Sequence, residues 1–158
     1  MNEISSENLT ELEKRYRTTF FIVLIQIFVV LILVAVAWFG VFRFETNLTD
    51  QDFKTLWVAV LFIAVGTFIL RRMFFSWERL KNIVLLKGVP GLLRTLQRNS
   101  VILGIFALIV AIVGFLISIF SGNTSDMFRA GVIALVVFLI NFPRKKVWKT
   151  IVSNLEKV

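Results

Sequence analysis

Residues 20–42 read FFIVLIQIFVVLILVAVAWFGVF, a run of 23 residues in which Gln26 is the one strongly polar side chain. An α-helix rises about 1.5 Å per residue, so about 20 apolar residues cross the hydrocarbon core of a bilayer, which is about 30 Å thick. The run reaches that length without a charged residue. It predicts a membrane-spanning helix and suggests that lipid is the main solvent of this chain.

Three more apolar runs follow. The second covers residues 56–75, provided that Arg71 and Arg72 extend their charged ends to the membrane surface. The third, residues 101–120, carries no charge. The fourth, residues 127–142, is the weakest, because its charge-free part is only 13 residues long. For that run a re-entrant or interfacial segment is the alternative to a full span.

The composition agrees with a membrane protein. Of 158 residues, 58% are hydrophobic, and the mean hydropathy is +0.85. Soluble domains average about 45–50% apolar residues, and a domain of this size buries too little surface to hide the excess. We therefore expect an all-α polytopic membrane protein in which residues 1–158 form a single domain of four transmembrane helices, arranged as two hairpins.

The absence of certain residue types excludes several kinds of chemistry. The chain contains no Cys and no His. This excludes sites built on thiolate or imidazole ligands, iron–sulfur clusters, and Cys–His or Ser–His nucleophiles. We expect no cofactor, no metal site and no catalytic residue. Asp50, Asp52 and Asp126 offer at most a weak metal contact outside the membrane, so we expect a protein that is not an enzyme.

The distribution of basic residues predicts an orientation. Three Lys and Arg residues precede the first span, seven lie from the end of the second span to the third, and five follow the fourth. The other two loop regions hold only two and one. The positive-inside rule then places both termini and residues 76–100 in the cytoplasm of a multi-pass protein of the cell or inner membrane. An even number of spans, as this alternation requires, supports the short fourth run.

Amphipathic patterns occupy the expected cytoplasmic segments. Residues 1–19 carry acids early and bases late, as a helix dipole favours. The connector, residues 76–100, begins with an amphipathic helix whose apolar face includes Trp77 and Leu80, and Gly88-Val89-Pro90-Gly91 predicts a break in that helix.

The tail, residues 143–158, has an apolar stripe opposite its lysines. The stripe consists of Val147, Trp148, Ile151, Val152 and Leu155. A basic amphipathic helix of this kind is typical of segments that lie in the membrane interface. We therefore expect interfacial helices on the cytoplasmic side.

The third run carries a seam of small residues at spacings of three and four. The seam consists of Gly104, Ala107, Ala111, Gly114 and Ser118. In lipid, small residues let helix backbones approach closely, so the seam should contact another helix. That helix belongs either to the same four-helix unit or to a second protein, and the spacing does not distinguish the two.

Few polar side chains lie within the spans. Gln26, Thr67 and Asn141 all fall toward the expected cytoplasmic ends, and no charged residue lies deep in a span. The three residues are candidates for lining a transport pathway. The alternative is that they form hydrogen bonds between helices, as polar residues in membrane bundles commonly do.

Clusters of basic residues follow two of the spans. They comprise Arg71, Arg72, Arg144, Lys145 and Lys146. At that position they are candidates for contact with anionic lipid headgroups. The chain has no soluble domain to hold nucleic acid, so we expect no nucleic-acid partner.

Three functions remain open. The first is a non-enzymatic accessory, assembly or regulatory subunit that packs against a larger membrane partner. The second is a homo-oligomeric channel or carrier, in which the embedded polar residues would line the pathway. The third is a membrane-shaping protein whose surface helices insert into the cytoplasmic leaflet.

Overall fold

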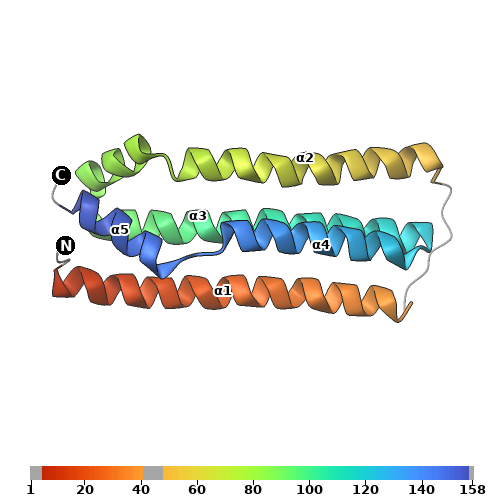
Figure 1. The fold of residues 1–158 in the computed structure, drawn as a ribbon, viewed down its shortest axis with the longest axis horizontal. Coiled ribbons are helices and arrows are strands. Elements are labelled where there is room, and N and C mark those ends of the chain that lie inside the picture. Colours follow the sequence, from red (N-terminus) through yellow and green to blue (C-terminus); the bar gives the residue numbers. More distant parts are fainter. Residues whose placement is uncertain (1–4, 41–47, 157–158) are drawn as a thin grey trace.

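The computed structural model describes residues 5–40 and 48–156. Over these ranges all regular structure is helical, as expected from the sequence, and the helices follow in the order shown in Figure 1. They are α1 (Ser6–Trp38), α2 (Asp50–Phe74), α3 (Trp77–Ser121), α4 (Thr124–Asn141) and α5 (Lys145–Leu155). The last residues of the expected first span, 41–42, lie outside the described residues, as do Arg43 and Lys157 of the charge count.

Within the described residues, four helices are long and apolar enough to cross a membrane, in agreement with the prediction of a membrane protein. They are α1, α2, α3 and the stretch Thr124–Leu155, which combines α4 and α5. Helix α1 has 33 residues and α3 has 45. Each is therefore longer than the ~20 residues that a bilayer requires. Helix α4 alone, with 18 residues, rises only about 27 Å.

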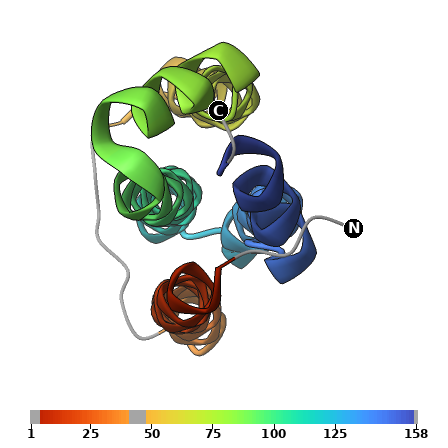
Figure 2. The same cartoon turned by 90° about the vertical axis from the view of Figure 1, so that its left-hand side faces the viewer.

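Helix α3 is the centre of the bundle. It packs against α1, α2 and α4, whereas α1 and α2 share no contact within the described residues. Figures 1 and 2 show α1 and α2 on opposite sides of the α3–α4 pair. The prediction of two hairpins did not include this separation of α1 from α2. Helices α1 and α2 are consecutive in sequence, yet each is held mainly by α3.

Small residues bring the central helices together. The Cβ that a larger residue would carry at Gly114 of α3 would overlap Ala130 of α4. A Cβ at Gly131 of α4 would lie only 2.9 Å from the Val34 side chain of α1. Glycine therefore permits backbone distances at these crossings that no side chain would allow.

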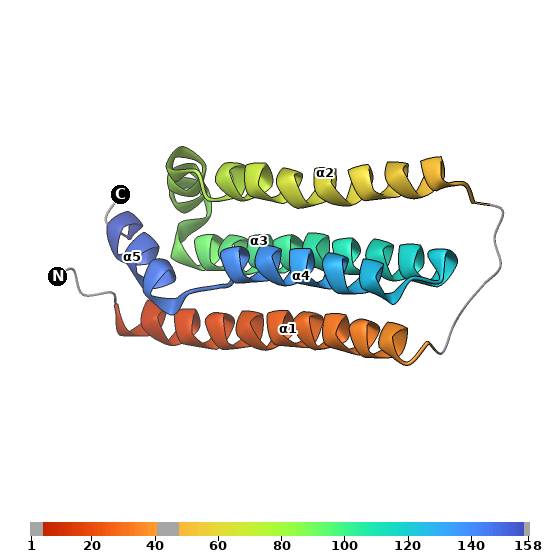
Figure 3. The ribbon, with the colours of Figure 1, turned by 45° about the vertical axis from the view of Figure 1, so that its right-hand side comes forward.

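Helix α3 is broken near its start, within the predicted Gly88–Gly91 segment. Gly88 has φ 64° and ψ −174°, outside the helical region and in the range of φ that favours glycine. Pro90 follows in the first turn of the next helical segment, where its missing N–H is not needed. Figure 3 shows the Trp77–Lys87 segment turned across the direction of the long helices.

Two hydrophobic cores result. The central core lies between the long helices and consists of Val23, Val30, Ala37, Val60, Ala64, Ala107, Val110, Ala111, Ile117, Met127, Ala134, Val137 and Phe138. The end core joins α5 to the parts of α1 and α3 that precede their expected spans. It consists of Leu12, Leu80, Val89, Leu92, Leu93, Leu96, Trp148, Val152 and Leu155.

Candidate functional site at the basic end of the bundle

The end core lies where three separate parts of the chain meet. The start of α1, the Trp77–Lys87 segment and α5 gather at one end of the long helices (Figure 3). Polar contacts tie α1 to the tail, because Asn8 Nδ2 donates to Glu156 Oε1 at 2.6 Å and Lys145 Nζ lies 2.6 Å from Glu13 Oε1. The hydrogen bond and the charge of Lys145 hold the pKa of the Glu13 carboxyl below its ordinary value. We call this region the basic end.

The apolar stripe of α5 packs onto the protein. Trp148, Val152 and Leu155 are buried in the end core, and only Val147 of the stripe is largely exposed. The sequence expectation placed this stripe in the membrane interface. The difference arises because α1 and α3 continue beyond their expected spans and present leucines that cover the stripe. A helical pattern shows that a stripe needs cover but does not show what covers it.

Aromatic contacts fix the linker between α4 and α5. The rings of Tyr16 and Trp148 meet edge to face with centroids 5.8 Å apart, and those of Phe20 and Phe142 meet similarly at 5.4 Å. The hydroxyl of Tyr16 donates to the carbonyl oxygen of Pro143 at 3.3 Å. Helix α1 therefore holds the linker on one side and leaves its other side free to line a cleft.

That cleft brings together two arginines that are far apart in sequence. Arg71, at the end of α2, and Arg144, just before α5, both line a cavity of about 200 Å³. Ser100 of α3 and Asn141 of α4 contribute polar groups, and aromatic walls are supplied by Phe75 and Phe142. We call this cavity the Arg71–Arg144 cleft.

The five cations predicted to meet lipid headgroups therefore divide. Arg71 and Arg144 share the cleft, whereas Arg72 lines a different surface hollow together with Arg79. Lys145 is paired with Glu13. Lys146 is exposed and lines neither hollow. Sequence position alone did not distinguish these roles, because all five residues directly follow an apolar run.

A larger cavity of about 660 Å³ lies at the bend between the Trp77–Lys87 segment and the rest of α3. Arg79, Lys87 and Arg98 line it together with Glu78, so its charge is mixed. The guanidinium of Arg79 also lies over the Phe74 ring, 5.1 Å from its centroid. We call it the elbow cavity.

The connector exposes more apolar surface than its pattern predicted. Leu80 is buried as the pattern implies, but Trp77, Leu85 and Leu86 are exposed. Met73, in α2 just before the connector, is exposed too. The bend at Gly88 turns this short segment so that only one edge of it reaches the end core.

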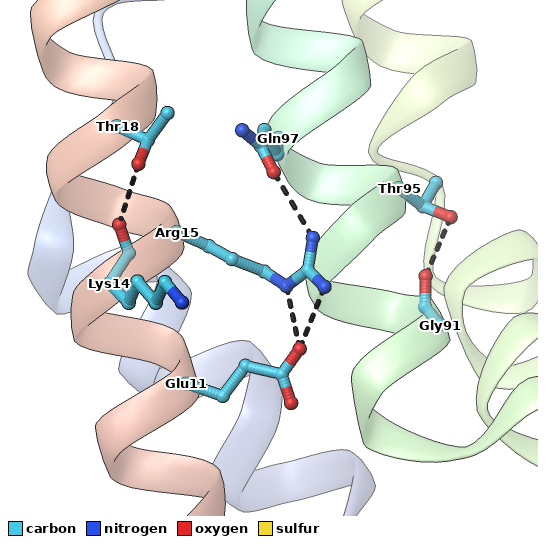
Figure 4. Close-up of polar contacts among 7 residues, drawn as sticks. All are labelled: Glu11, Lys14, Arg15, Thr18, Gly91, Thr95 and Gln97. Carbon is cyan, nitrogen blue, oxygen red and sulfur yellow. Dashed lines mark hydrogen bonds and ion pairs between the residues drawn. The ribbon is translucent and has the colours of Figure 1, made fainter.

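A polar contact fastens α1 to α3 on another side of the basic end. Arg15 forms an ion pair with Glu11 at 2.8 Å and donates through Nη1 to Gln97 Oε1 at 3.2 Å. Figure 4 shows the guanidinium held between these two acceptors. Glu11 lies on the same helix as Arg15 and orients the guanidinium, and the bond to Gln97 joins α1 to α3.

The seam of small residues lies inside the bundle. All five members, Gly104, Ala107, Ala111, Gly114 and Ser118, are buried. A Cβ at Gly104 would overlap the side chain of Gln26, and the hydroxyl of Ser118 donates to the carbonyl oxygen of Asn123 at 3.0 Å. The seam therefore contacts helices of its own chain, and no part of it is exposed for a second protein.

The three candidates for a transport pathway make separate contacts, two of them within a single helix and one, from Gln26, between α1 and α3. Thr67 donates to the carbonyl oxygen of Ile63, and Asn141 donates to that of Val137, each at 2.8 Å within its own helix. Gln26 Nε2 donates weakly to the carbonyl oxygen of Val101 at 3.5 Å. No hydrogen bond joins any two of the three within the part of the chain that the structure describes.

The aspartates near the opposite end of the bundle also have local partners. Asp52 accepts hydrogen bonds from the backbone N–H and the hydroxyl of Thr49, both at 2.8 Å, and these lower the pKa of its carboxyl. Asp126 accepts from the Ser121 hydroxyl at 3.0 Å. Both aspartates lie in the first turn of a helix, where a negative charge is favourable.

Comparison with protein-family models, curated proteins and solved structures found no match to this chain.

Proposed function

We propose that this chain is a small non-enzymatic integral membrane protein that serves as an accessory, assembly or regulatory subunit of a larger membrane protein. Both termini would lie in the cytoplasm. Two features support this orientation. The sequence concentrates Lys and Arg on the side of the termini and the connector, and the segments that carry them gather at one end of the long helices.

The main support for the proposed association is the open space beside Gly66 of α2. A Cβ at this position would meet no atom of the described residues within 4 Å, so the packing among them does not require glycine here. Glycine inside a helix costs about 1 kcal/mol relative to alanine. In membranes, small residues let another helix approach closely. Ala59 is exposed two turns earlier, on the same side of α2, and extends the small surface.

Helix α2 has the surface that such an association needs. Only 17% of its most apolar window is buried, compared with 50% for α3. Phe62, between Ala59 and Gly66, is 80% exposed. Lipid covers such a surface when no protein does, and a helix of a partner protein can replace the lipid without uncovering any polar group.

The two other functions have less support. A channel or carrier needs polar residues that share a pathway, whereas Gln26, Thr67 and Asn141 each bond to nearby backbone. A membrane-shaping protein needs an apolar wedge on its surface helices, whereas the stripe of α5 packs into the end core.

Co-purification in mild detergent tests the association. The wild-type protein, extracted from its native membrane, should carry a larger membrane protein in stoichiometric amount, as measured by the mass of the complex and by peptide identification. Gly66→Leu should reduce the recovered partner at least about tenfold, because the larger side chain separates the helices. Val65→Leu, at the neighbouring exposed position, is the matched control and should retain the partner.

Two results would contradict parts of this proposal. A wild-type chain that purifies only as a monomer, or only as an assembly with itself, would contradict an accessory role. A partner that survives Gly66→Leu in full would contradict the assignment of α2 as the contact surface.

A further inference from the structure

We propose that the Arg71–Arg144 cleft binds a phosphate group, carried by an anionic phospholipid or by a free phosphate ester. This goes beyond the proposed association with a partner and does not depend on it. Four features of the cleft favour such a ligand: its charges, the helix terminus beside it, its polar floor and its position.

The charges in the cleft favour an anion. Arg71 and Arg144 both line it, and neither takes part in an ion pair within the described residues. Among the described residues, no Asp or Glu lines the cleft. A guanidinium presents two parallel N–H donors that match a phosphate, so two arginines at one cavity form a strong site. The elbow cavity is a weaker candidate, because Glu78 is among its lining residues.

A helix begins at the same cleft. Arg144 is the N-cap residue of α5, and its side chain does not cap the helix. The N–H groups of the first helical turn have no acceptor within the helix, and the helix dipole makes this end positive. Val147 and Trp148, from the start of α5, form part of the cleft wall. The terminus thus adds to the attraction that the arginines exert on an anion.

The floor of the cleft is polar and contains an unsatisfied group. Ser100 and Asn141 are 3% and 9% exposed, and both line the cleft. Asn141 Nδ2 donates to Val137, but its Oδ1 has no hydrogen-bond partner among the described residues. A buried acceptor without a donor is costly. A hydroxyl next to the phosphate of the ligand would supply such a donor.

The position of the cleft favours a lipid as the source of the phosphate. Arg71 ends the apolar run of α2, and Asn141 is the last residue of α4, so the cleft lies where two apolar helices end. Headgroups occupy this level of a bilayer.

Native mass spectrometry of the full chain in neutral detergent tests the site. The probes are dioctanoyl phosphatidylglycerol, dioctanoyl phosphatidylcholine, glycerol 3-phosphate and inorganic phosphate, each titrated separately. We expect one saturable site for phosphatidylglycerol and at least tenfold weaker binding of phosphatidylcholine. Arg71→Gln and Arg144→Gln should each weaken phosphatidylglycerol binding about tenfold or more, the usual effect of losing a charge-assisted hydrogen bond.

Arg72→Gln and Lys146→Gln are the matched controls. Each removes one positive charge close in sequence to a cleft arginine but outside the cleft, and should weaken binding less than about twofold, as expected for an exposed charge. Arg71→Lys keeps the charge but loses the planar guanidinium, and it should weaken binding severalfold. Helical circular dichroism and the thermal midpoint identify any variant that fails to fold.

Each result has a defined meaning. Binding of phosphatidylglycerol well above that of glycerol 3-phosphate supports the site and assigns it to lipid. Comparable binding of glycerol 3-phosphate supports the phosphate site and assigns it to a free ester. Equal losses in the cleft variants and in their controls would overturn the proposal, because they would indicate only diffuse charge attraction. Failure of the wild-type chain to bind phosphatidylglycerol, glycerol 3-phosphate or inorganic phosphate would overturn it as well.

Discussion

The central core and the end core are built from different residues. Alanine and valine predominate in the central core, whereas six of the nine end-core residues are leucines, joined by Trp148. Apolar side chains gain little by moving from lipid into protein, so helices in a bilayer are held by close backbone approach, which small residues permit. In water the burial of large apolar side chains is itself favourable. The two cores of this chain are therefore stabilised in different ways, the central core by close backbone approach and the end core by burial of large side chains.

Polar contacts follow the same division. At the basic end, the ion pair Lys145–Glu13 joins α5 to α1. The pair Arg15–Glu11 lies within α1 and orients the Arg15 guanidinium, which also donates to Gln97 of α3. Between the long helices, the polar side chains mostly bond to the backbone of their own helix, as Thr67 does. Charged pairs suit a region in contact with water, where an imperfect pair still finds solvent. We therefore expect substitutions and changes of pH to affect the stability of the two regions differently.

Trp148→Ala should have the largest effect, because it opens the end core. Trp148 is only 2% exposed, and its ring meets that of Tyr16. Replacing a buried Trp by Ala costs about 3–5 kcal/mol. We expect α5 to detach while the long helices remain folded, which limited trypsin digestion would detect as early cleavage after the lysines of the tail.

Val147→Ala is the control for that experiment, since Val147 is 45% exposed on the same helix. It should leave the tail protected. If trypsin cleaves the tail no faster in Trp148→Ala than in the wild type, the end core does not hold α5 as the structure indicates. If the whole bundle unfolds together, the two cores are one cooperative unit and the comparison fails.

Gly114→Leu should have the next largest effect, because it forces apart the backbones of the central core. Any side chain here would overlap Ala130 of α4. Overpacking a well-filled core costs about 1–3 kcal/mol. Graded denaturation in mixed detergent micelles should show this loss, whereas Ile112→Leu, at an exposed position of the same helix, should be close to neutral. A neutral Gly114→Leu would mean that close approach does not stabilise α3 against α4.

Sequence reasoning located the apolar runs and the break near Gly88, because both are local properties. A run of twenty apolar residues and a Gly–Pro pair constrain the chain wherever they occur. The spacing also places Gly104 and Gly114 in one seam, since helical geometry is fixed. The spacing does not indicate which helices they meet: Gly104 meets Gln26 of α1, and Gly114 meets Ala130 of α4.

The arrangement of the basic end was much harder to predict. The cleft joins Arg71 to Arg144, 73 positions apart, through the way α2 and α4 pack on α3. No local pattern encodes that distance. The stripe of α5 was recognised, but lipid and the leucines of α1 and α3 would cover it equally well. The leucines cover the stripe because α1 and α3 extend far enough to reach it. A sequence gives only a weak signal for how far a helix continues beyond its apolar run.

Gly66→Ala should have a smaller effect and the opposite sign. Gly66 lies within a helix, but a Cβ there meets nothing within 4 Å. We therefore expect the isolated chain to gain up to about 1 kcal/mol, from the helix propensity of alanine. The same denaturation assay measures it. Comparison of Gly66→Ala with Gly114→Leu tests whether stability depends on Gly114, which packs against α4, but not on Gly66, which packs against none of the other described helices. A loss of stability on Gly66→Ala would show that α2 needs this glycine for its own fold.

The dependence of stability on Glu13 should be the smallest effect and should appear only at the basic end. Lys145 lowers the pKa of Glu13 in the folded state. A carboxyl whose folded pKa is depressed stabilises the fold above its ordinary pKa, about 4.5, and this contribution disappears as the pH falls through the lower folded value. The thermal midpoint of the wild type should exceed that of Glu13→Gln at neutral pH, and the gap should close in acid. Lys149 is a weaker neighbouring charge. In a chain that carries Lys149→Gln, the difference in thermal midpoint caused by Glu13→Gln should be slightly smaller. A gap that persists unchanged into strong acid would show that Glu13 acts through packing, and that the charges at the basic end do not separate it from the central core.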